Sequence, residues 1–217
     1  MWNSLLTNAR SKPLYDWKVL LPGIDIGQFR AKYLNPAPGE ALRLLCPDAA
    51  DCPEECHYRK VRVLSSGLMA CCPLDIARPR IPVTPEDIGI FRLNYARVHK
   101  EIADALGIEF SSVDLDDAFF WELGCLKTGT GSRMPVYISY YINTMVFEHR
   151  LENLLKEDRT FILLVGRLAD VPKAMLAALR QKKCVCLGLD DCVSIAPDGS
   201  FAADGETVNL LNGLRSA

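Results

Sequence analysis

The chain has 217 residues, of which 49% are hydrophobic and 24% are charged, and its formal net charge at pH 7 is −2. A chain of this length and apolar content buries a core as one domain or two, which excludes intrinsic disorder and a collagen-like architecture. The small net charge also argues against a protein that coats nucleic acid or anionic membranes by bulk charge, although it permits a local basic face.

No segment approaches the roughly 20 apolar residues that are needed to cross a bilayer, and residues 1–6 lack the features of a secretory signal. The sequence therefore predicts a cytoplasmic protein with no membrane partner. The nine cysteines are odd in number, and Cys184, Cys186 and Cys192 have apolar neighbours. Free cysteines in such surroundings behave as small hydrophobic residues, so no disulfide framework is expected.

The composition changes after residue 83. Nine of the 13 prolines come before Thr84, and the first 83 residues carry 11 basic and 8 acidic side chains, against 14 and 19 in the remainder. The segment 77–82, which holds two prolines and two arginines, is typical of a boundary. We therefore expect a cysteine-rich module over residues 1–83, with short helices near 2–9 and 25–33, followed by a larger domain over residues 84–217.

A β-hairpin is predicted directly after Cys56. Residues 57–64 alternate in polarity, residues 65–67 can turn, and residues 68–70 return as a second strand. Five cysteines crowd around this hairpin, and they are Cys46, Cys52, Cys56, Cys71 and Cys72.

This cysteine layout resembles a zinc ribbon in general form, over about residues 44–74, without pointing to a family. Structural zinc is held by four thiolates or imidazoles, commonly on two short loops that a hairpin brings together. Adjacent side chains of an extended strand point in opposite directions, so only one of Cys71 and Cys72 is expected to bind zinc. The expected ligands are Cys46, Cys52, Cys56 and one of that pair, and His57 is the reserve ligand. An iron–sulfur cluster, which lacks its usual spacing here, and free cysteines are the alternatives.

The second domain opens with a helix predicted over residues 85–106. Thr84 is a suitable N-cap, Pro85 suits the first helical position, and Gly107 supplies the stop. Apolar residues recur along it every three or four positions, and His99 is expected on the solvated side. An acidic connector over residues 114–117 leads into two further strands, 119–126 and 135–142.

The remaining pattern predicts a parallel βαβ unit, a small hairpin and a last helix. The expected elements are helix 144–156, strand 160–165, helix 171–182 with Asp170 as its N-cap, strand 184–189, hairpin strands 192–195 and 200–202, and helix 206–214. The fold class is α+β, in which a zinc-ribbon-like module precedes a mixed-sheet α/β domain.

The segment 127–133 is glycine-rich, but it lies between two strands and does not match a phosphate-binding loop, so it is interpreted as a hairpin tip. Tyr58, Lys60 and Arg62 share one face of an extended strand, which suits stacking on bases and contacts to phosphate. The sequence therefore favours a non-catalytic adaptor or regulatory protein that contacts nucleic acid or a protein partner.

Two other classes stay open. A metal-dependent hydrolase or nuclease would use carboxylates among residues 114–122 or Asp190 and Asp191. A structural subunit of a larger assembly would present a contiguous apolar surface.

Overall fold

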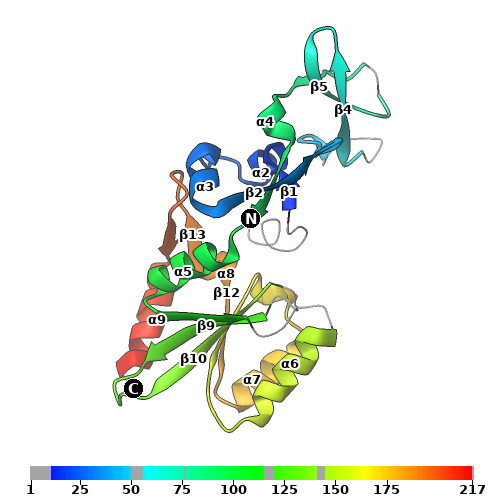
Figure 1. Cartoon of the computed structure of the whole chain (residues 1–217). Coiled ribbons are helices and arrows are strands. Elements are labelled where there is room, and N and C mark those ends of the chain that lie inside the picture. The colour runs from blue at the N-terminus through cyan, green and yellow to red at the C-terminus, as the bar shows by residue number, and fades with distance from the viewer. Residues whose placement is uncertain (1–10, 50–55, 76, 115–119, 141–144, 217) are drawn as a thin grey trace. The chain divides into compact units, whose positions relative to one another are not determined.

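The computed structural model describes residues 11–49, 56–75, 77–114, 120–140 and 145–216. The chain forms two compact units, an N-terminal unit (Ala9–Asn94) and a C-terminal unit that consists mainly of Tyr95–Ala217. Each unit combines helices with β-sheet (Figure 1), which confirms the α+β class. The division falls between Asn94 and Tyr95, whereas the sequence predicted a boundary after residue 83. The helix predicted near residues 2–9 lies outside the described residues.

The first sheet of the N-terminal unit has three antiparallel strands and contacts two helices. The strand order is β1 (Ser11–Pro13), β7 (Gly89–Leu93), β2 (Leu34–Glu40), and the helices are α2 (Leu14–Leu20) and α3 (Ile26–Tyr33). Asp25 caps α3 by accepting two backbone N–H groups of its first turn, which confirms the predicted second helix. Trp17, Phe29 and Tyr33, from these two helices, are almost completely buried.

The single helix predicted over residues 85–106 is wrong. Its ends are correct, because Thr84 forms a capping box at α4 (Pro85–Ile88) and Gly107, at φ +65°, follows the end of α5 (Tyr95–Leu106). Between them, β7 pairs with β1 on one side and β2 on the other. Backbone groups that gain hydrogen bonds on both sides of a central strand override the helical spacing of the apolar residues, and Gly89 weakens the helix further.

The second sheet of the N-terminal unit has four antiparallel strands. Their order is β3 (Arg43–Leu45), β4 (Tyr58–Leu64), β5 (Gly67–Cys71), β6 (Ile81–Pro82). The hairpin predicted after Cys56 is confirmed as β4 and β5, and Gly67 starts the return strand at φ +109°, a conformation that favours glycine.

A five-stranded mixed sheet is the centre of the C-terminal unit. The order is β12 (Val185–Gly188), β11 (Ile162–Val165), β10 (Arg133–Ser139), β9 (Phe120–Lys127), β8 (Glu109–Asp114). The predicted hairpin of β9 and β10 and the predicted parallel pairing of β11 with β12 are both confirmed. Strand β10 is also parallel to β11, so the parallel part of the sheet has three strands.

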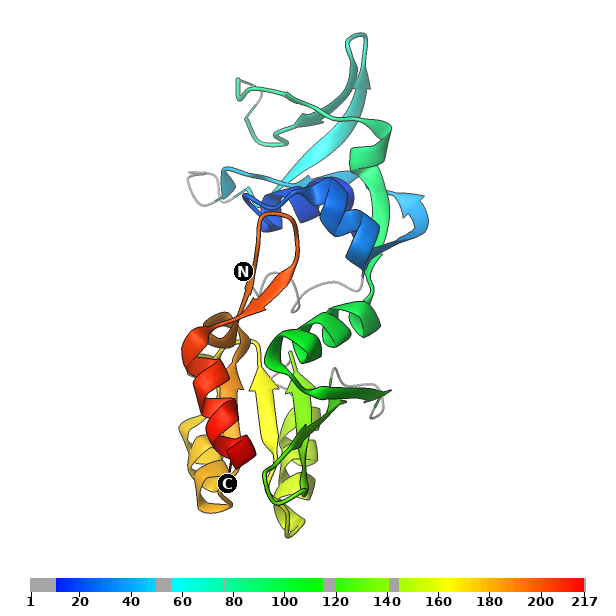
Figure 2. The same cartoon turned by 90° about the vertical axis from the view of Figure 1, so that its left-hand side faces the viewer.

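Helices lie on both faces of this sheet, and Figure 2 shows α9 in front of it with α6 and α7 behind. The remaining elements are α6 (Met145–Lys156), η2 (Leu168–Asp170), α7 (Lys173–Gln181), α8 (Leu189–Cys192), β13 (Val193–Ile195), β14 (Phe201–Ala203) and α9 (Gly205–Ser216). Phe120, Phe147 and Phe161 belong to the core between the sheet and α6 and α7.

The predicted cap of α7 is wrong. Asp170 belongs to the 3₁₀ turn η2, and the N-cap of α7 is Pro172, which makes no side-chain hydrogen bond. The short turn takes up Asp170, and the helix begins at Lys173, two residues after the predicted start. None of the helices in the described part of the chain has the length and apolar character needed to cross a bilayer.

Candidate functional site

The four-stranded sheet of the N-terminal unit has two chemically different faces. One face packs into an apolar cluster, to which the sheet contributes Leu44, Val61, Leu68, Ala70 and Ile81. Successive side chains of a strand point to opposite faces, so the residues between these positions face away from the cluster.

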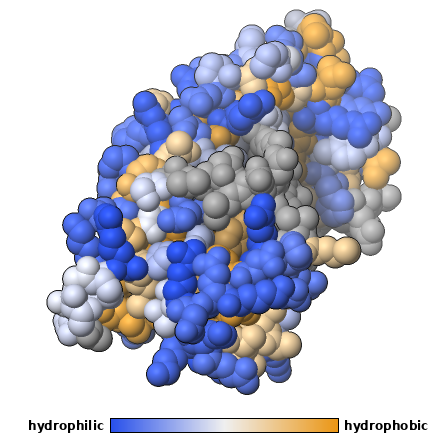
Figure 3. Space-filling view, turned by 60° about the horizontal axis from the view of Figure 1, so that its bottom comes forward, coloured by the Kyte–Doolittle hydropathy of each residue, from blue (hydrophilic) through white to orange (hydrophobic). Residues whose placement is uncertain are grey.

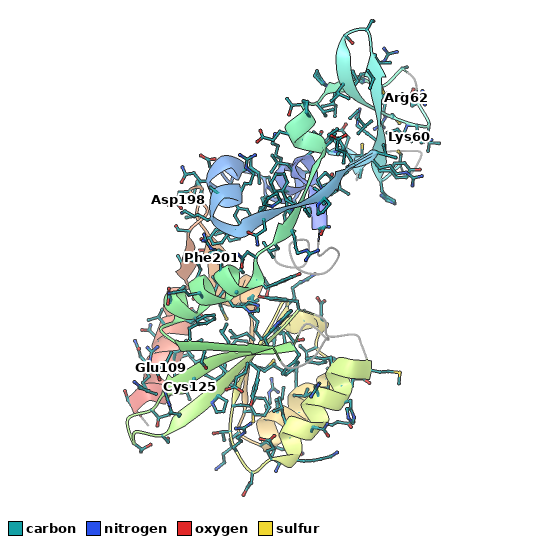
Figure 4. All side chains as sticks on the ribbon, viewed as in Figure 1. Lys60, Arg62, Glu109, Cys125, Asp198 and Phe201 are labelled. Atoms are coloured by element: carbon teal, nitrogen blue, oxygen red, sulfur yellow. The ribbon has the colours of Figure 1, made fainter. Side chains whose placement is uncertain are left out.

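Strand β4 carries a row of polar residues on this outer face. Tyr58, Lys60 and Arg62 alternate with Arg59 and Val61, which lie on the core side. Lys60 and Arg62 are exposed and extend from the same side of the strand (Figure 4). The alternation that the sequence predicted for these three residues is therefore present in the folded unit.

Arg43 extends the outer face onto β3. It lies opposite Lys60 in register, and its guanidinium carbon lies 4.6 Å from the centroid of the Tyr58 ring. A guanidinium over an aromatic ring is held by cation–π attraction and keeps its own planar surface for stacking. We call the set Arg43, Tyr58, Lys60 and Arg62 the basic face.

An open hollow of about 280 Å³ lies beside the basic face and shares Arg62 with it. Arg78 and Arg80 also line this hollow, and the carboxylate among its lining residues is Asp75, 3.8 Å from Arg78. In the described part of the chain, neither Arg62 nor Arg80 forms an ion pair within 4.0 Å. Sequence reasoning missed Arg78 and Arg80, because they reach β4 only through the pairing of β6 with β5.

Arg59 is a buried cation beneath the sheet, only 1% exposed. Its guanidinium donates to the carbonyl of Pro79 at 2.7 Å and to the carboxylate of Asp48 at 3.0 Å. Burial acts to lower the pKa of Arg59, but the nearby Cys46 thiol and Asp48 carboxylate outweigh burial and hold this pKa above its ordinary value. Arg59 thereby links β4 to the segment that carries Arg78 and Arg80.

Two of the predicted zinc ligands, Cys46 and Cys56, are buried where β3 and β4 meet. The backbone N–H of Cys46 donates to the carbonyl of His57 at 3.1 Å, and the Cys56 thiol donates to the carbonyl of Tyr58 at 2.9 Å. His57, the reserve ligand, is exposed next to them.

The structure distinguishes Cys72 from Cys71. The backbone N–H groups of Leu74 and Asp75, together with the nearby Cys56 side chain, lower the pKa of the Cys72 thiol. Cys71 instead lies opposite Lys60 in register, on the outer side of the sheet. Of the adjacent pair, Cys72 is therefore the one that lies with Cys56.

Cys52, the fifth cysteine of the predicted cluster, lies outside the described residues. Within the described ranges, no three His, Cys, Asp or Glu side chains are arranged to hold a metal ion together. The structural zinc, the zinc-ribbon form and the alternative of an iron–sulfur cluster all stay predictions.

The glycine-rich hairpin tip over residues 127–133 is flanked by two cations, and both form ion pairs with one carboxylate. Lys127 and Arg133 bind the Glu109 carboxylate at 3.0 and 2.5 Å. The hydrogen bond from Arg133, and after it that from Lys127, lowers the pKa of Glu109 to about 2. The Cys125 thiol also donates to Glu109 at 3.4 Å, and Figure 4 shows these two side chains together. The arrangement fits a hairpin tip rather than a phosphate site.

The carboxylates considered for a hydrolase or nuclease are only partly described, since residues 115–119 lie outside the described ranges. Glu122 lines a hollow of about 190 Å³ together with Arg150 and Arg159. Asp190 lies in α8, 3.6 Å from Arg167. Among the side chains that the structure describes, neither carboxylate joins two further metal-binding groups.

His99 is a correction to the sequence analysis, because it is 1% exposed rather than solvated. Its ring centroid lies 4.9 Å from that of Trp121 and 5.7 Å from that of Tyr140, and α5 contacts β8, β9 and β14. Burial lowers the pKa of His99 to about 4. The residue is buried because strands from later in the chain pack against the helix face that the sequence assigned to solvent.

Figure 3 bears on the hypothesis of a structural subunit. On the face of the C-terminal unit in this view, hydrophilic residues predominate and the hydrophobic ones are interspersed among them. The described residues of this face therefore do not form the contiguous apolar surface that the hypothesis requires.

Comparison of the chain with known protein families, with curated proteins and with solved structures finds no match.

Proposed function

We propose that this chain is a non-catalytic adaptor that binds single-stranded nucleic acid through the basic face of its N-terminal unit. The observation that carries the proposal is the separation of chemistry across one sheet: apolar side chains on the core side, and Arg43, Tyr58, Lys60 and Arg62 on the other. A folded protein with a net charge of −2 that gathers cations on one exposed face has a local preference for anions.

The chemistry of the basic face favours single-stranded nucleic acid over a general polyanion. Single strands expose bases, which stack on aromatic rings and on guanidinium planes, and they carry regularly spaced phosphates that bind cations. The stacked pair of Arg43 and Tyr58 offers the planar surfaces, and Lys60 and Arg62 offer the charges. An acidic protein partner would use the charges without the stacking, so it leaves the planar surfaces of Arg43 and Tyr58 without a role.

The test replaces Tyr58 and Arg62 by alanine together and measures the affinity for a fluorescent 20-nucleotide single strand by anisotropy. We expect the affinity to fall by about tenfold or more, because stacking on an aromatic side chain contributes about 1–3 kcal/mol per base. Loss of one phosphate contact should also make the negative slope of log K against log salt shallower by about 0.7. Lys173→Ala, at an exposed position of α7, is the matched control. Unchanged affinity in the double variant would contradict the proposal.

We also propose that zinc, held by Cys46, Cys52, Cys56 and Cys72, closes the base of the hairpin that presents the basic face. Cys46, Cys56 and Cys72 are not gathered around one point in the described residues, so zinc binding must draw these thiolates together. Cys71 lies opposite Lys60 on the outer side of the sheet, which supports Cys72 over Cys71 as the fourth ligand. A zinc ion with four protein ligands supplies folding energy and no open position for catalysis.

Elemental analysis of the untagged protein tests the metal. We expect one zinc per chain, lost in Cys46→Ser and retained in Cys125→Ser, whose thiol lies in the C-terminal unit next to Glu109. A metal-free native protein would refute the zinc site and leave the basic face to be tested by itself.

A further inference from the structure

The hollow beside the basic face differs from the face itself in shape and charge. It is concave, with a volume of about 280 Å³, whereas the basic face is one side of a sheet. Three arginines and one aspartate line it beside Cys71 and Cys72, and these four charged side chains sum to +2. A hollow of this size is smaller than most ligand pockets, which span about 300–1,000 Å³, so it suits one compact charged group.

The three arginines are held from different directions. Arg62 extends from β4, which is paired on both sides within the sheet. Arg78 and Arg80 flank Pro79, whose carbonyl accepts the hydrogen bond from the buried Arg59. Strand β6 begins directly after Arg80. Arg59 therefore holds the backbone between Arg78 and Arg80 from the core side. Because this backbone is already held, ligand binding costs little conformational entropy there.

The guanidinium groups are also available for a ligand. Arg78 has one carboxylate neighbour, Asp75, at the long distance of 3.8 Å. Arg62 and Arg80 have no ion-pair partner within 4.0 Å in the described part of the chain. Guanidinium groups bind phosphate oxygens with paired N–H donors, which is the geometry that Arg supplies and Lys does not.

We propose that this hollow binds a phosphomonoester, the group that ends a phosphorylated nucleic-acid strand. A phosphodiester carries one negative charge, whereas a phosphomonoester carries about −1.5 to −2 at pH 7 and has three free oxygens. The net charge of +2 and the three guanidinium groups match the monoester. This inference rests on the proposed binding of a strand to the basic face, since Arg62 belongs to both and places the strand end next to the hollow.

Anisotropy with three strands of one sequence tests the inference: one with a 5′-phosphate, one with a 3′-phosphate and one with neither. We expect one phosphorylated strand to bind the native protein roughly tenfold more tightly than the unphosphorylated strand, because charge-assisted hydrogen bonds are the strong ones. The gain should disappear in the double variant Arg78→Ala with Arg80→Ala and persist in Lys173→Ala. Equal affinity of the native protein for all three strands would refute the phosphomonoester site and leave the proposed function standing.

A second measurement separates failure of the site from failure of the proposed function. Inorganic phosphate is titrated into ¹⁵N-labelled protein while the Nε–H signals of the arginines are followed. We expect phosphate to shift the Nε–H signals of Arg62, Arg78 and Arg80 in the native protein. In the double variant, which lacks Arg78 and Arg80, we expect no arginine signal to shift. If no strand binds but phosphate still shifts these signals, the proposed function is wrong and the hollow is a phosphate site. Absence of these shifts in the native protein overturns the site.

Discussion

Replacing Arg59 by methionine is expected to lower the free energy of unfolding of the N-terminal unit by about 2–3 kcal/mol. The change removes a buried guanidinium that donates to Pro79 and Asp48, and it leaves the Pro79 carbonyl without this donor. Breaking a fully buried ion pair costs about 3–5 kcal/mol, but Asp48 is 57% exposed and regains water, so the expected loss is smaller. Native-state hydrogen exchange of the amides in β4 and β5 measures it.

Arg62→Met is the matched control for this prediction, because Arg62 lies on the same strand with its side chain exposed. Its stability should change by less than about 0.5 kcal/mol, the usual range for surface substitutions. Equal protection of β4 in Arg59→Met and in the native protein would show that the buried guanidinium does not hold β4 to the segment that carries Arg78 and Arg80.

The C-terminal unit is expected to lose about 3 kcal/mol of stability as the pH falls from 6.5 to 4, because of His99. The folded state keeps this imidazole neutral down to a pKa of about 4, whereas in the unfolded chain it takes up a proton near pH 6.5. Unfolding therefore binds a proton throughout this pH range, and the stability that is present above pH 6.5 is lost on acidification. Urea unfolding at pH 7 and pH 4, followed by the NMR signals of β10 and β11, measures the difference.

His99→Leu should remove most of this pH dependence at little cost at pH 7, since Nε2 of His99 has no hydrogen-bond partner in the described part of the chain. His149→Leu is the matched control, because His149 is an exposed histidine on α6. This control should keep the pH dependence of the native protein. A native C-terminal unit that is equally stable at pH 7 and pH 4 would contradict the prediction.

Asp16 gives the N-terminal unit a pH dependence of the opposite sign. Burial raises the pKa of Asp16 to about 6, against the lowering effects of the Leu45 N–H and of Lys12. The folded state thus holds a proton between pH 3.8 and 6 that the unfolded chain releases, so this contribution to stability is lost as the pH rises through that range. Because Asp16 and His99 contribute with opposite signs, the His99 measurement requires signals from the C-terminal unit alone.

Local patterns determined much of the fold, and the reason is visible at particular residues. Alternation over residues 57–64 and a glycine that accepts positive φ specify the β4–β5 hairpin without outside help. Thr84 and Asp87 form their capping box within four residues, and Gly107 ends α5 by its own conformation. Short apolar strands separated by a helix likewise predicted the parallel pairing of β11 with β12. Each of these signals lies within one element or one short run of consecutive elements.

Part of the candidate site was predictable for the same reason. Tyr58, Lys60 and Arg62 share a face because a strand alternates, which needs no knowledge of the rest of the fold. Arg43, Arg78 and Arg80 could not be added from the sequence, because strand register and the pairing of β6 with β5 bring them to this surface.

Local sequence patterns were therefore enough to predict the α+β class, most of the helices and strands, and one basic row on β4. Packing between distant segments makes residues 89–93 the central strand of a sheet, buries Arg59 and His99, and places three arginines around one hollow. Periodicity records only which side of an element is apolar. Burial of a charged or polar side chain, and the meeting of side chains from distant segments, depend on partners that no local pattern contains.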